Sequence, residues 1–157
     1  MNIESILTRE RTVSLLSASS KKRAIELAAI NIVNTLPDLE VGEVYRSLIE
    51  REKLGSTAIG DGVAIPHCRL VNCDSIVGGL FVFKESVNFS AHDNQPVQIM
   101  FVLLVPESET SEHLAALAML AERFGDEAYR TSLIEAADNQ QLYDCAVGAL
   151  HSAEQEQ

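Results

Sequence analysis

The chain has 157 residues, of which 46% are hydrophobic and 22% charged, a balance that fits one globular domain and excludes wholesale disorder. Its 12 Lys and Arg residues against 23 Asp and Glu residues give a net charge of −11, which argues against binding to nucleic-acid backbones or anionic lipid. A protein partner with a basic face is favoured instead, with an acidic surface that serves only solubility as the alternative.

The first half of the chain alternates runs of β-branched residues with runs of helix formers. In chain order these runs predict a brief strand over residues 12–16, a helix over about 20–34, a second helix over about 41–53, and a small hairpin over 57–65. Ser19 and Ser20 are the candidate N-caps of the first helix, and Gly55 follows the C-terminus of the second. The glycine-rich turn at 60–62 joins the two strands of the hairpin.

The second half predicts two stronger strands followed by helices. These are strands over 76–83 and 97–105 with a loop at 89–96 between them, then helices over 111–124, about 127–136 and about 140–150, with a frayed tail from 151. The strand at 97–105 is nearly continuous apolar sequence, as expected of a central strand covered on both faces. The sequence therefore predicts an α/β fold, with a mixed parallel and antiparallel sheet flanked by helices on both faces, in one domain spanning 1–157.

The backbone directly before the histidine at position 67 is restricted by a proline. It follows Pro66, whose fixed φ and missing N–H predict that the chain leaves the sheet there on a rigid residue. A side chain held in this way loses little backbone entropy when it takes part in a reaction. His67 is thus either a reactive group at the sheet edge or an ordinary surface or capping residue.

Features suited to an anion surround His67 in the sequence. Gly55-Ser56-Thr57 follows the second helix, where backbone N–H and hydroxyl groups can approach a ligand closely. Arg51 and Lys53 lie in the last turn of that helix, where a cation interacts with the helix dipole and can also reach an anion. Each feature has an ordinary capping or packing explanation, but together they predict a phosphate site.

A second histidine, His113, falls in the first turn of the helix predicted to begin at Thr110 or Ser111. The positive end of the helix dipole disfavours imidazolium there and attracts anions, so a neutral His113 suits the neighbourhood of a phosphoryl group. An exposed first-turn residue is the alternative. His92 and His151 are interpreted as surface residues.

Other chemistries find less support in the sequence. His67, Cys68 and Cys73 could supply metal ligands, but their spacing matches no common zinc pattern. Neighbouring residues on a strand point to opposite faces, which argues against a Cys68 nucleophile with His67 as its base. The usual nucleotide-binding loops and the serine-hydrolase motif do not occur. No metal and no other cofactor are expected.

The chain carries no sign of export or of a membrane span. Its first residues lack the basic and apolar regions of a secretory signal, and the longest apolar stretch, 99–105, is far shorter than the ~20 residues that a span requires. Cys68, Cys73 and Cys145 make an odd number, so no framework of disulfides is implied. A cytoplasmic protein without direct membrane insertion is predicted.

The sequence GSTAIGDGVAIPH at 55–67 resembles the active-site signature of the fructose/mannitol class of enzyme IIA proteins, from the bacterial phosphoenolpyruvate-dependent phosphotransferase system. The resemblance covers nearly the whole chain. REKLGST at 51–57, DNQPV at 93–97 and LLVP at 103–106 look most like its nitrogen-regulatory branch. Cys68 departs from the glycine that is common after the histidine in this branch, which adds a possible redox sensitivity.

The resemblance implies a role for each of these residues. It implies that His67 is phosphorylated on a ring nitrogen and that His113 lies against it. It further implies that Arg51 and the region of Gly55, Ser56 and Thr57 support the phosphoryl group. An imidazole that is neutral at cytoplasmic pH can accept a phosphoryl group and pass it on, without a nucleotide or a metal held by the protein.

The function implied is that of a phosphocarrier that accepts phosphate from an HPr-like carrier protein and regulates other proteins by its phosphorylation state. In this branch the resemblance suggests potassium transporters and sensor kinases as targets. Nothing in the chain resembles a IIB cysteine domain or a membrane IIC domain, which favours regulation over sugar delivery. Three alternatives remain: a sugar-specific enzyme IIA that passes phosphate to a IIB cysteine, a binding module in which His67 is structural, and a His/Cys metallohydrolase.

Overall fold

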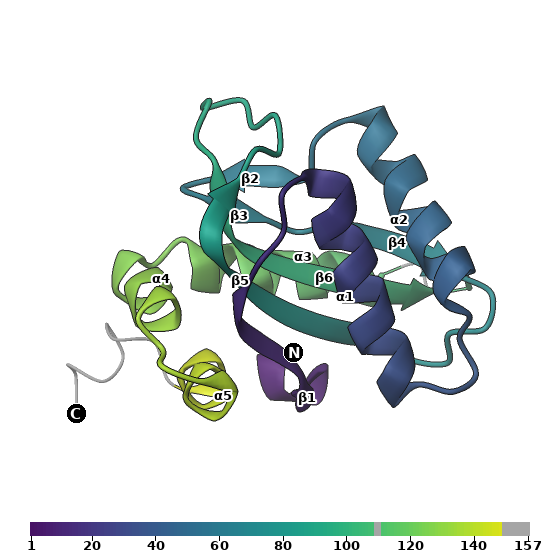
Figure 1. Ribbon diagram of the computed structural model, residues 1–157. Coiled ribbons are helices and arrows are strands. Elements are labelled where there is room, and N and C mark those ends of the chain that lie inside the picture. The colour runs from purple at the N-terminus through teal and green to yellow at the C-terminus, as the bar shows by residue number, and fades with distance from the viewer. Residues whose placement is uncertain (109–110, 149–157) are drawn as a thin grey trace.

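The computed structural model describes residues 1–108 and 111–148, which form a six-stranded sheet with helices on both faces (Figure 1). The strands are β1 (Leu7–Leu16), β2 (Ala58–Gly60), β3 (Val63–Ala64), β4 (His67–Leu70), β5 (Val77–Val87) and β6 (Val97–Pro106). The helices are α1 (Lys21–Thr35), α2 (Val41–Leu54), α3 (Glu112–Phe124), α4 (Glu127–Ile134) and α5 (Asn139–Val147), preceded by the short 3₁₀ helix η1 (Ile3–Ser5).

The sheet is mixed, with the order β1-β5-β6-β3-β2, and β4 also pairs with β6. β1 runs parallel to β5, β5 is antiparallel to β6, and both β3 and β4 are parallel to β6. β2 closes the far edge as the antiparallel partner of β3. The predicted mixed sheet and the predicted hairpin around the turn at 60–62 are thereby confirmed.

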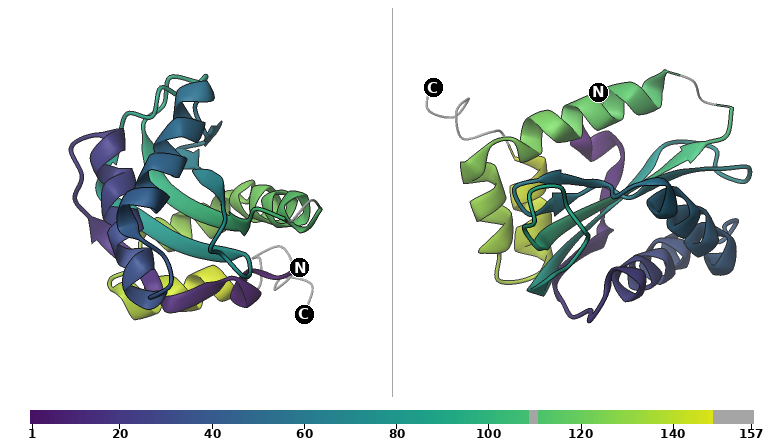
Figure 2. Two further views of the ribbon diagram at one scale, coloured as in Figure 1. Left: turned by 90° about the vertical axis from the view of Figure 1, so that its right-hand side faces the viewer. Right: turned by 90° about the horizontal axis from the view of Figure 1, so that it is seen from above.

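Two apolar clusters, one on each face of the sheet, form the core. Figure 2 shows α1 and α2 on one face and α3, α4 and α5 on the other. The central strand β6 serves both clusters, because Met100, Val102 and Leu104 point toward α1 and α2 while Phe101 and Leu103 point the other way. This explains why the sequence of β6 is apolar throughout, and it confirms the prediction of a strand covered on both faces.

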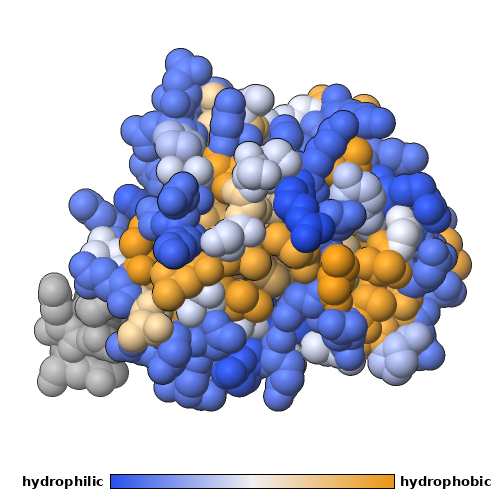
Figure 3. Space-filling model, viewed as in Figure 1, coloured by the Kyte–Doolittle hydropathy of each residue, from blue (hydrophilic) through white to orange (hydrophobic). Residues whose placement is uncertain are grey.

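The face of the molecule that carries α1 has both hydrophilic and hydrophobic surface. In Figure 3 hydrophobic surface is visible over the centre of this face, while the projecting side chains around it are hydrophilic. Isolated apolar side chains such as Ile30 and Val41 are exposed. Single exposed apolar residues of this kind are common on protein surfaces.

The predicted helices are present, with small shifts at their ends. The Ser20 hydroxyl accepts a hydrogen bond from the N–H of Arg23 (3.1 Å), so Ser20 is the N-cap of α1 as predicted. Ser111 is the residue at the start of α3, although its side chain makes no capping hydrogen bond. Thr110, the end of the last predicted helix at 149–150 and the predicted frayed tail lie outside the described residues.

The first strand is longer than predicted because a polar segment pairs with the sheet. β1 begins at Leu7 rather than at residue 12, and it includes the charged residues before Thr12. Arg11 is only 8% exposed, and its guanidinium donates to the carbonyl oxygens of Gly78 (2.9 Å) and Ile6 (3.2 Å). These bonds satisfy a buried cation, which a hydrophobicity pattern does not reveal.

The prediction that the chain leaves the sheet at Pro66 is wrong. β3 and β4 lie in line along the same strand β6, with Ala64 opposite Met100 and His67 opposite Leu103. Pro66 lacks an N–H, but its carbonyl oxygen accepts a hydrogen bond from the N–H of Leu103 (2.9 Å). His67 therefore begins a paired strand, and the sheet itself fixes its backbone.

Gly78 has the least space for a side chain of the glycines in the described part of the chain, which leads to a stability prediction. A Cβ at this position of β5 would lie 2.5 Å from Cζ of Phe101, which is fully buried, so the ring or the strand would have to shift. We expect Gly78→Ala to lower the free energy of unfolding by about 1–3 kcal/mol through overpacking. Urea unfolding measures this, with Gly55→Ala as the control, because a Cβ on Gly55 meets nothing within 4 Å. Equal unfolding midpoints for the two variants would contradict the packing argument.

Candidate active site

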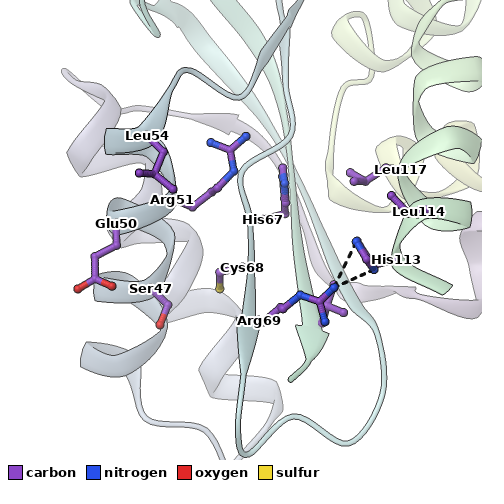
Figure 4. Close-up of a pocket in the computed structure, with 11 residues that line it drawn as sticks. Ser47, Glu50, Arg51, Leu54, His67, Cys68, Arg69, His113, Leu114 and Leu117 are labelled. Atoms are coloured by element: carbon purple, nitrogen blue, oxygen red, sulfur yellow. Dashed lines mark hydrogen bonds between the residues drawn. The ribbon is translucent and has the colours of Figure 1, made fainter. Parts of the chain in front are cut away.

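His67 lies in a cavity of about 740 Å³ where the C-terminal part of α2 and the start of α3 face each other across β4 (Figure 4). The cavity is lined by Ser47, Glu50, Arg51, Leu54, His67, Cys68, Arg69, Val105, His113, Leu114 and Leu117. In Figure 4 the His67 ring lies between Arg51 on one side and His113 on the other. Three of the side chains that the sequence marked as reactive or charged, His67, Arg51 and His113, thus come from three separate elements and meet at one cavity.

The His67 imidazole has one ring nitrogen engaged with the backbone. Its Nδ1 lies 2.8 Å from the carbonyl oxygen of Ile65. A carbonyl oxygen only accepts, so Nδ1 carries the proton and donates it. In the neutral ring the lone pair is then on Nε2, the nitrogen available for a new bond.

The surroundings of His67 favour its neutral form. Partial burial is the largest influence and lowers the pKa of His67 below its usual value of 6.5. The charge of Arg51 and the proximity of His113 lower this pKa further. The hydrogen bond to Ile65 and the charge of Glu52 act in the opposite direction but do not outweigh burial. At neutral pH the site presents an uncharged nucleophile.

Arg51 places a permanent cation beside this ring. It lies in the last turn of α2, and its Nη1 donates to the carbonyl oxygen of Gly55 (3.0 Å). That bond holds the guanidinium at the cavity while leaving other N–H groups of its planar fork for an anion. Lys53, the other cation predicted near the site, lines a separate depression with Lys21 and Lys22.

His113 and Arg69 form a pair on the opposite wall. Nη2 of Arg69 lies 3.3 Å from Nδ1 and 3.4 Å from Nε2 of the His113 ring. Arg69 was not among the predicted site residues. Side chains alternate between the two faces of a strand, so residues 67 and 69 of β4 lie on the same face. This relation did not point to Arg69 in the sequence analysis because no strand was predicted after Pro66.

The region 55–57 contributes differently from the prediction, because its hydroxyls are engaged elsewhere. The Ser56 hydroxyl donates to the carbonyl oxygen of Phe89 (2.7 Å), and the Thr57 hydroxyl donates to the carboxylate of Glu52. Neither residue, nor Gly55, is among the residues that line the cavity. Gly55 and Thr57 contact the site through their backbone. The carbonyl oxygen of Gly55 accepts a hydrogen bond from Arg51, and the carbonyl oxygen of Thr57 accepts one from the N–H of Ile65 (3.0 Å).

Cys68 does not act as a nucleophile in this geometry. It packs in the cluster under α1 and α2, whereas Ile65 packs in the other cluster, so alternation along the chain sends His67 and Cys68 to opposite faces. Burial raises the pKa of the Cys68 thiol to about 12, which leaves it protonated and poorly reactive. This argues against the redox sensitivity considered above. Within residues 1–108 and 111–148, no group of three or more His, Cys, Asp or Glu side chains is arranged to hold a metal ion.

Comparison with known proteins assigns this architecture to a family. The family model described as "Phosphoenolpyruvate-dependent sugar phosphotransferase system, EIIA 2" matches residues 5–146. A nitrogen regulatory protein of Pseudomonas aeruginosa is 39% identical over 147 residues, covering 94% of this chain and 96% of that protein. A nitrogen regulatory protein of Escherichia coli K12 is also 39% identical, over 144 residues, with 91% of this chain and 88% of that protein covered.

A solved structure shows the same fold. The crystal structure of the nitrogen regulatory protein IIA-Ntr from Neisseria meningitidis superposes with a TM-score of 0.83 at 36% sequence identity. The match covers 92% of this chain and 98% of that one. Within the part of the chain that the structure describes, none of the helices has the length and apolar character needed to cross a bilayer.

Proposed function

The chain belongs to the EIIA 2 family of the phosphoenolpyruvate-dependent sugar phosphotransferase system, in its nitrogen-regulatory branch, and from this premise we propose that it is a phosphocarrier whose acceptor atom is Nε2 of His67. The observation that carries the proposal is the hydrogen bond from Nδ1 to the Ile65 carbonyl oxygen, which leaves the Nε2 lone pair free in a cavity with Arg51. Family membership supports this class of reaction, and the hydrogen bond of Nδ1 supports the choice of Nε2 as the acceptor.

The proposed phosphoryl transfer involves only the donor protein and residues of this chain. The lone pair of Nε2 forms a bond to phosphorus, while the bond between phosphorus and the donor protein breaks and its electron pair leaves with the donor. The Nδ1 proton stays on the ring, where the Ile65 carbonyl oxygen stabilises the positive charge that develops. Arg51 and Arg69 are cations placed to stabilise the oxygens of the phosphoryl group.

In this proposal some of the supporting residues line the cavity, and others act indirectly by holding the residues that do. His113 and Arg69 form one wall, where the Arg69 guanidinium donates to the His113 ring and so helps to fix the position of that ring at the cavity. Gly55 acts through its carbonyl oxygen, which holds Arg51, and Thr57 acts through its own, which holds Ile65. Ser56 fixes the segment against Phe89.

The rim of the cavity fits a protein donor. Leu54 is 86% exposed and Leu114 is 60% exposed, and these large apolar side chains flank the charged interior of the cavity. Apolar side chains around a polar centre are typical of a surface that another protein covers. We therefore take an HPr-like phosphocarrier as the donor, in the cytoplasm, where the net charge of −11 would favour a donor with a basic face. Target proteins, such as potassium transporters or sensor kinases, would respond to the phosphorylation state.

The pKa of His67 predicts how the reaction depends on pH. Since that pKa is lowered, we expect the ring to stay neutral, and the acceptance rate to stay on its plateau, until the pH falls below about 6.5. NMR titration of the His67 ring in the unphosphorylated protein gives the midpoint directly. In the same range the unfolded chain binds the proton more readily than the folded one, so the contribution of His67 to stability also falls as the pH falls below about 6.5. A midpoint above 6.5 would contradict this account of the site.

Incubation with phosphoenolpyruvate, enzyme I and an HPr-like carrier tests the proposed function. We expect the intact mass to increase by one phosphoryl group, and the modification to be lost in acid, as a phosphohistidine is. An unchanged mass would favour a binding module in which His67 is structural. Efficient onward transfer to a IIB cysteine, with sugar uptake lost on deletion of the gene, would favour the sugar-specific alternative over regulation.

A further inference from the structure

Glu52 is a buried carboxylate behind the cavity. It is 6% exposed, in the last turn of α2, and it follows Arg51 directly in the sequence. Its two oxygens accept hydrogen bonds from the N–H of Thr57 (3.3 and 2.8 Å), and one of them also accepts from the Thr57 hydroxyl. A buried charge is costly unless it is satisfied in this way, so the position of Thr57 is tightly constrained by that of Glu52.

Thr57 connects this carboxylate to the reactive ring. Its carbonyl oxygen accepts the N–H of Ile65 (3.0 Å), and the carbonyl oxygen of Ile65 lies 2.8 Å from Nδ1 of His67. Three consecutive links therefore join Glu52 to His67: carboxylate to Thr57, Thr57 to Ile65, and Ile65 to imidazole. The first two links join different segments, namely the end of α2 to the residue before β2, and that residue to the junction of β3 and β4. The third link lies within this junction, between residues two apart in the chain.

We propose that Glu52 is a positioning residue for phosphoryl acceptance, which acts through Thr57 and Ile65 to keep the Ile65 carbonyl oxygen on Nδ1 of His67 and thereby the lone pair on Nε2. This inference rests on the proposed function. Glu52 is not among the residues that line the cavity, so its effect is indirect. If the chain of hydrogen bonds is broken, the ring proton distributes between both nitrogens. Nε2 then carries the lone pair for only part of the time.

The direct readout is the tautomer of His67, seen in long-range ¹H–¹⁵N spectra of the unphosphorylated protein. We expect the unmodified chain to show mainly the Nδ1–H form. Glu52→Met, which keeps the length of the side chain but removes both acceptors, is expected to give a mixture of tautomers and to slow phosphorylation about 10-fold or more. Glu52→Gln keeps one acceptor for the Thr57 N–H, so it is expected to restore most of the Nδ1–H population and of the rate.

Leu48→Ala is the matched control for lost stability. Leu48 is buried one turn earlier on the same helix and takes no part in the hydrogen-bond chain. We expect this variant to melt at a lower temperature than the unmodified chain yet to keep its tautomer and its rate while folded. A folded Glu52→Met variant with the tautomer ratio and rate of the unmodified chain would overturn the proposal.

A second pair of variants decides the matter if Glu52→Met does not fold. Thr57→Ser keeps the hydroxyl that Glu52 accepts, whereas Thr57→Val removes it with little change of shape. We expect more of the Nε2–H tautomer in Thr57→Val than in Thr57→Ser, and equal ratios would overturn the inference. The tautomer is measured without any donor, so the role of Glu52 is tested even if the chain accepts no phosphate, which would overturn the proposed function separately.

Discussion

Replacing His67 with alanine is expected to abolish phosphorylation completely, while the protein still folds. The ring is half-buried and donates one hydrogen bond to the backbone of Ile65, just before β4, so its removal costs one hydrogen bond and a partly buried side chain rather than a core contact. Among the described residues that line the cavity, His67 is the histidine with a hydrogen bond from its ring to a backbone carbonyl oxygen. Intact-mass measurement after incubation with phosphoenolpyruvate, enzyme I and carrier should show no added phosphoryl group.

His92→Ala is the control for this experiment. His92 is an exposed residue of the loop between β5 and β6, outside the cavity, and its replacement should leave the extent of phosphorylation unchanged. Circular dichroism of both variants checks that the fold is retained. Undiminished labelling of a folded His67→Ala variant would place the acceptor elsewhere.

The second large effect is expected at Arg51. Removing the guanidinium takes away a permanent cation from the cavity that receives a doubly charged group, at a site where partial burial strengthens electrostatic interactions. We expect Arg51→Ala to lower the rate of phosphorylation by about 10²–10³-fold, the cost typical of losing one preorganised donor to a developing charge. Quenched-flow measurement with the phosphorylated carrier at a fixed concentration gives this rate.

Two further variants separate charge from geometry at this position. Arg51→Lys keeps the charge but not the planar fork, so its rate should lie between that of the unmodified chain and that of Arg51→Ala. Lys53→Ala removes a cation from the same helical turn but from a different depression of the surface, and it should keep the original rate. If Lys53→Ala slowed the reaction as much as Arg51→Ala, general attraction of an acidic chain to its donor would explain the effect better than a phosphoryl contact.

Much of the fold was predictable because local chemistry and tertiary packing agree. The apolar run of β6 is buried on both faces, the cap at Ser20 starts α1, and Gly55 ends α2. The same holds for the candidate site: a histidine after a proline, an arginine in the last turn of a helix and a histidine in a first turn are local features, and the structure brings them to one cavity.

What could not be predicted depends on contacts between distant segments. β4 was missed because the pairing of His67 with Leu103 is decided by β6, more than thirty residues away along the chain. Without β4 the period-two relation that places Arg69 beside His113 was not visible. Likewise, hydroxyls at Ser56 and Thr57 look available in the sequence, and only the positions of Phe89 and Glu52 show that they are engaged.

The most direct test of the account is to identify the phosphorylated nitrogen by NMR, in protein labelled with ¹⁵N in its histidine rings. We expect a single phosphohistidine at His67, with phosphorus coupled to Nε2 and with the proton retained on Nδ1 against the Ile65 carbonyl oxygen. Phosphorus coupled to Nδ1 of His67, or found on any other residue, would contradict it.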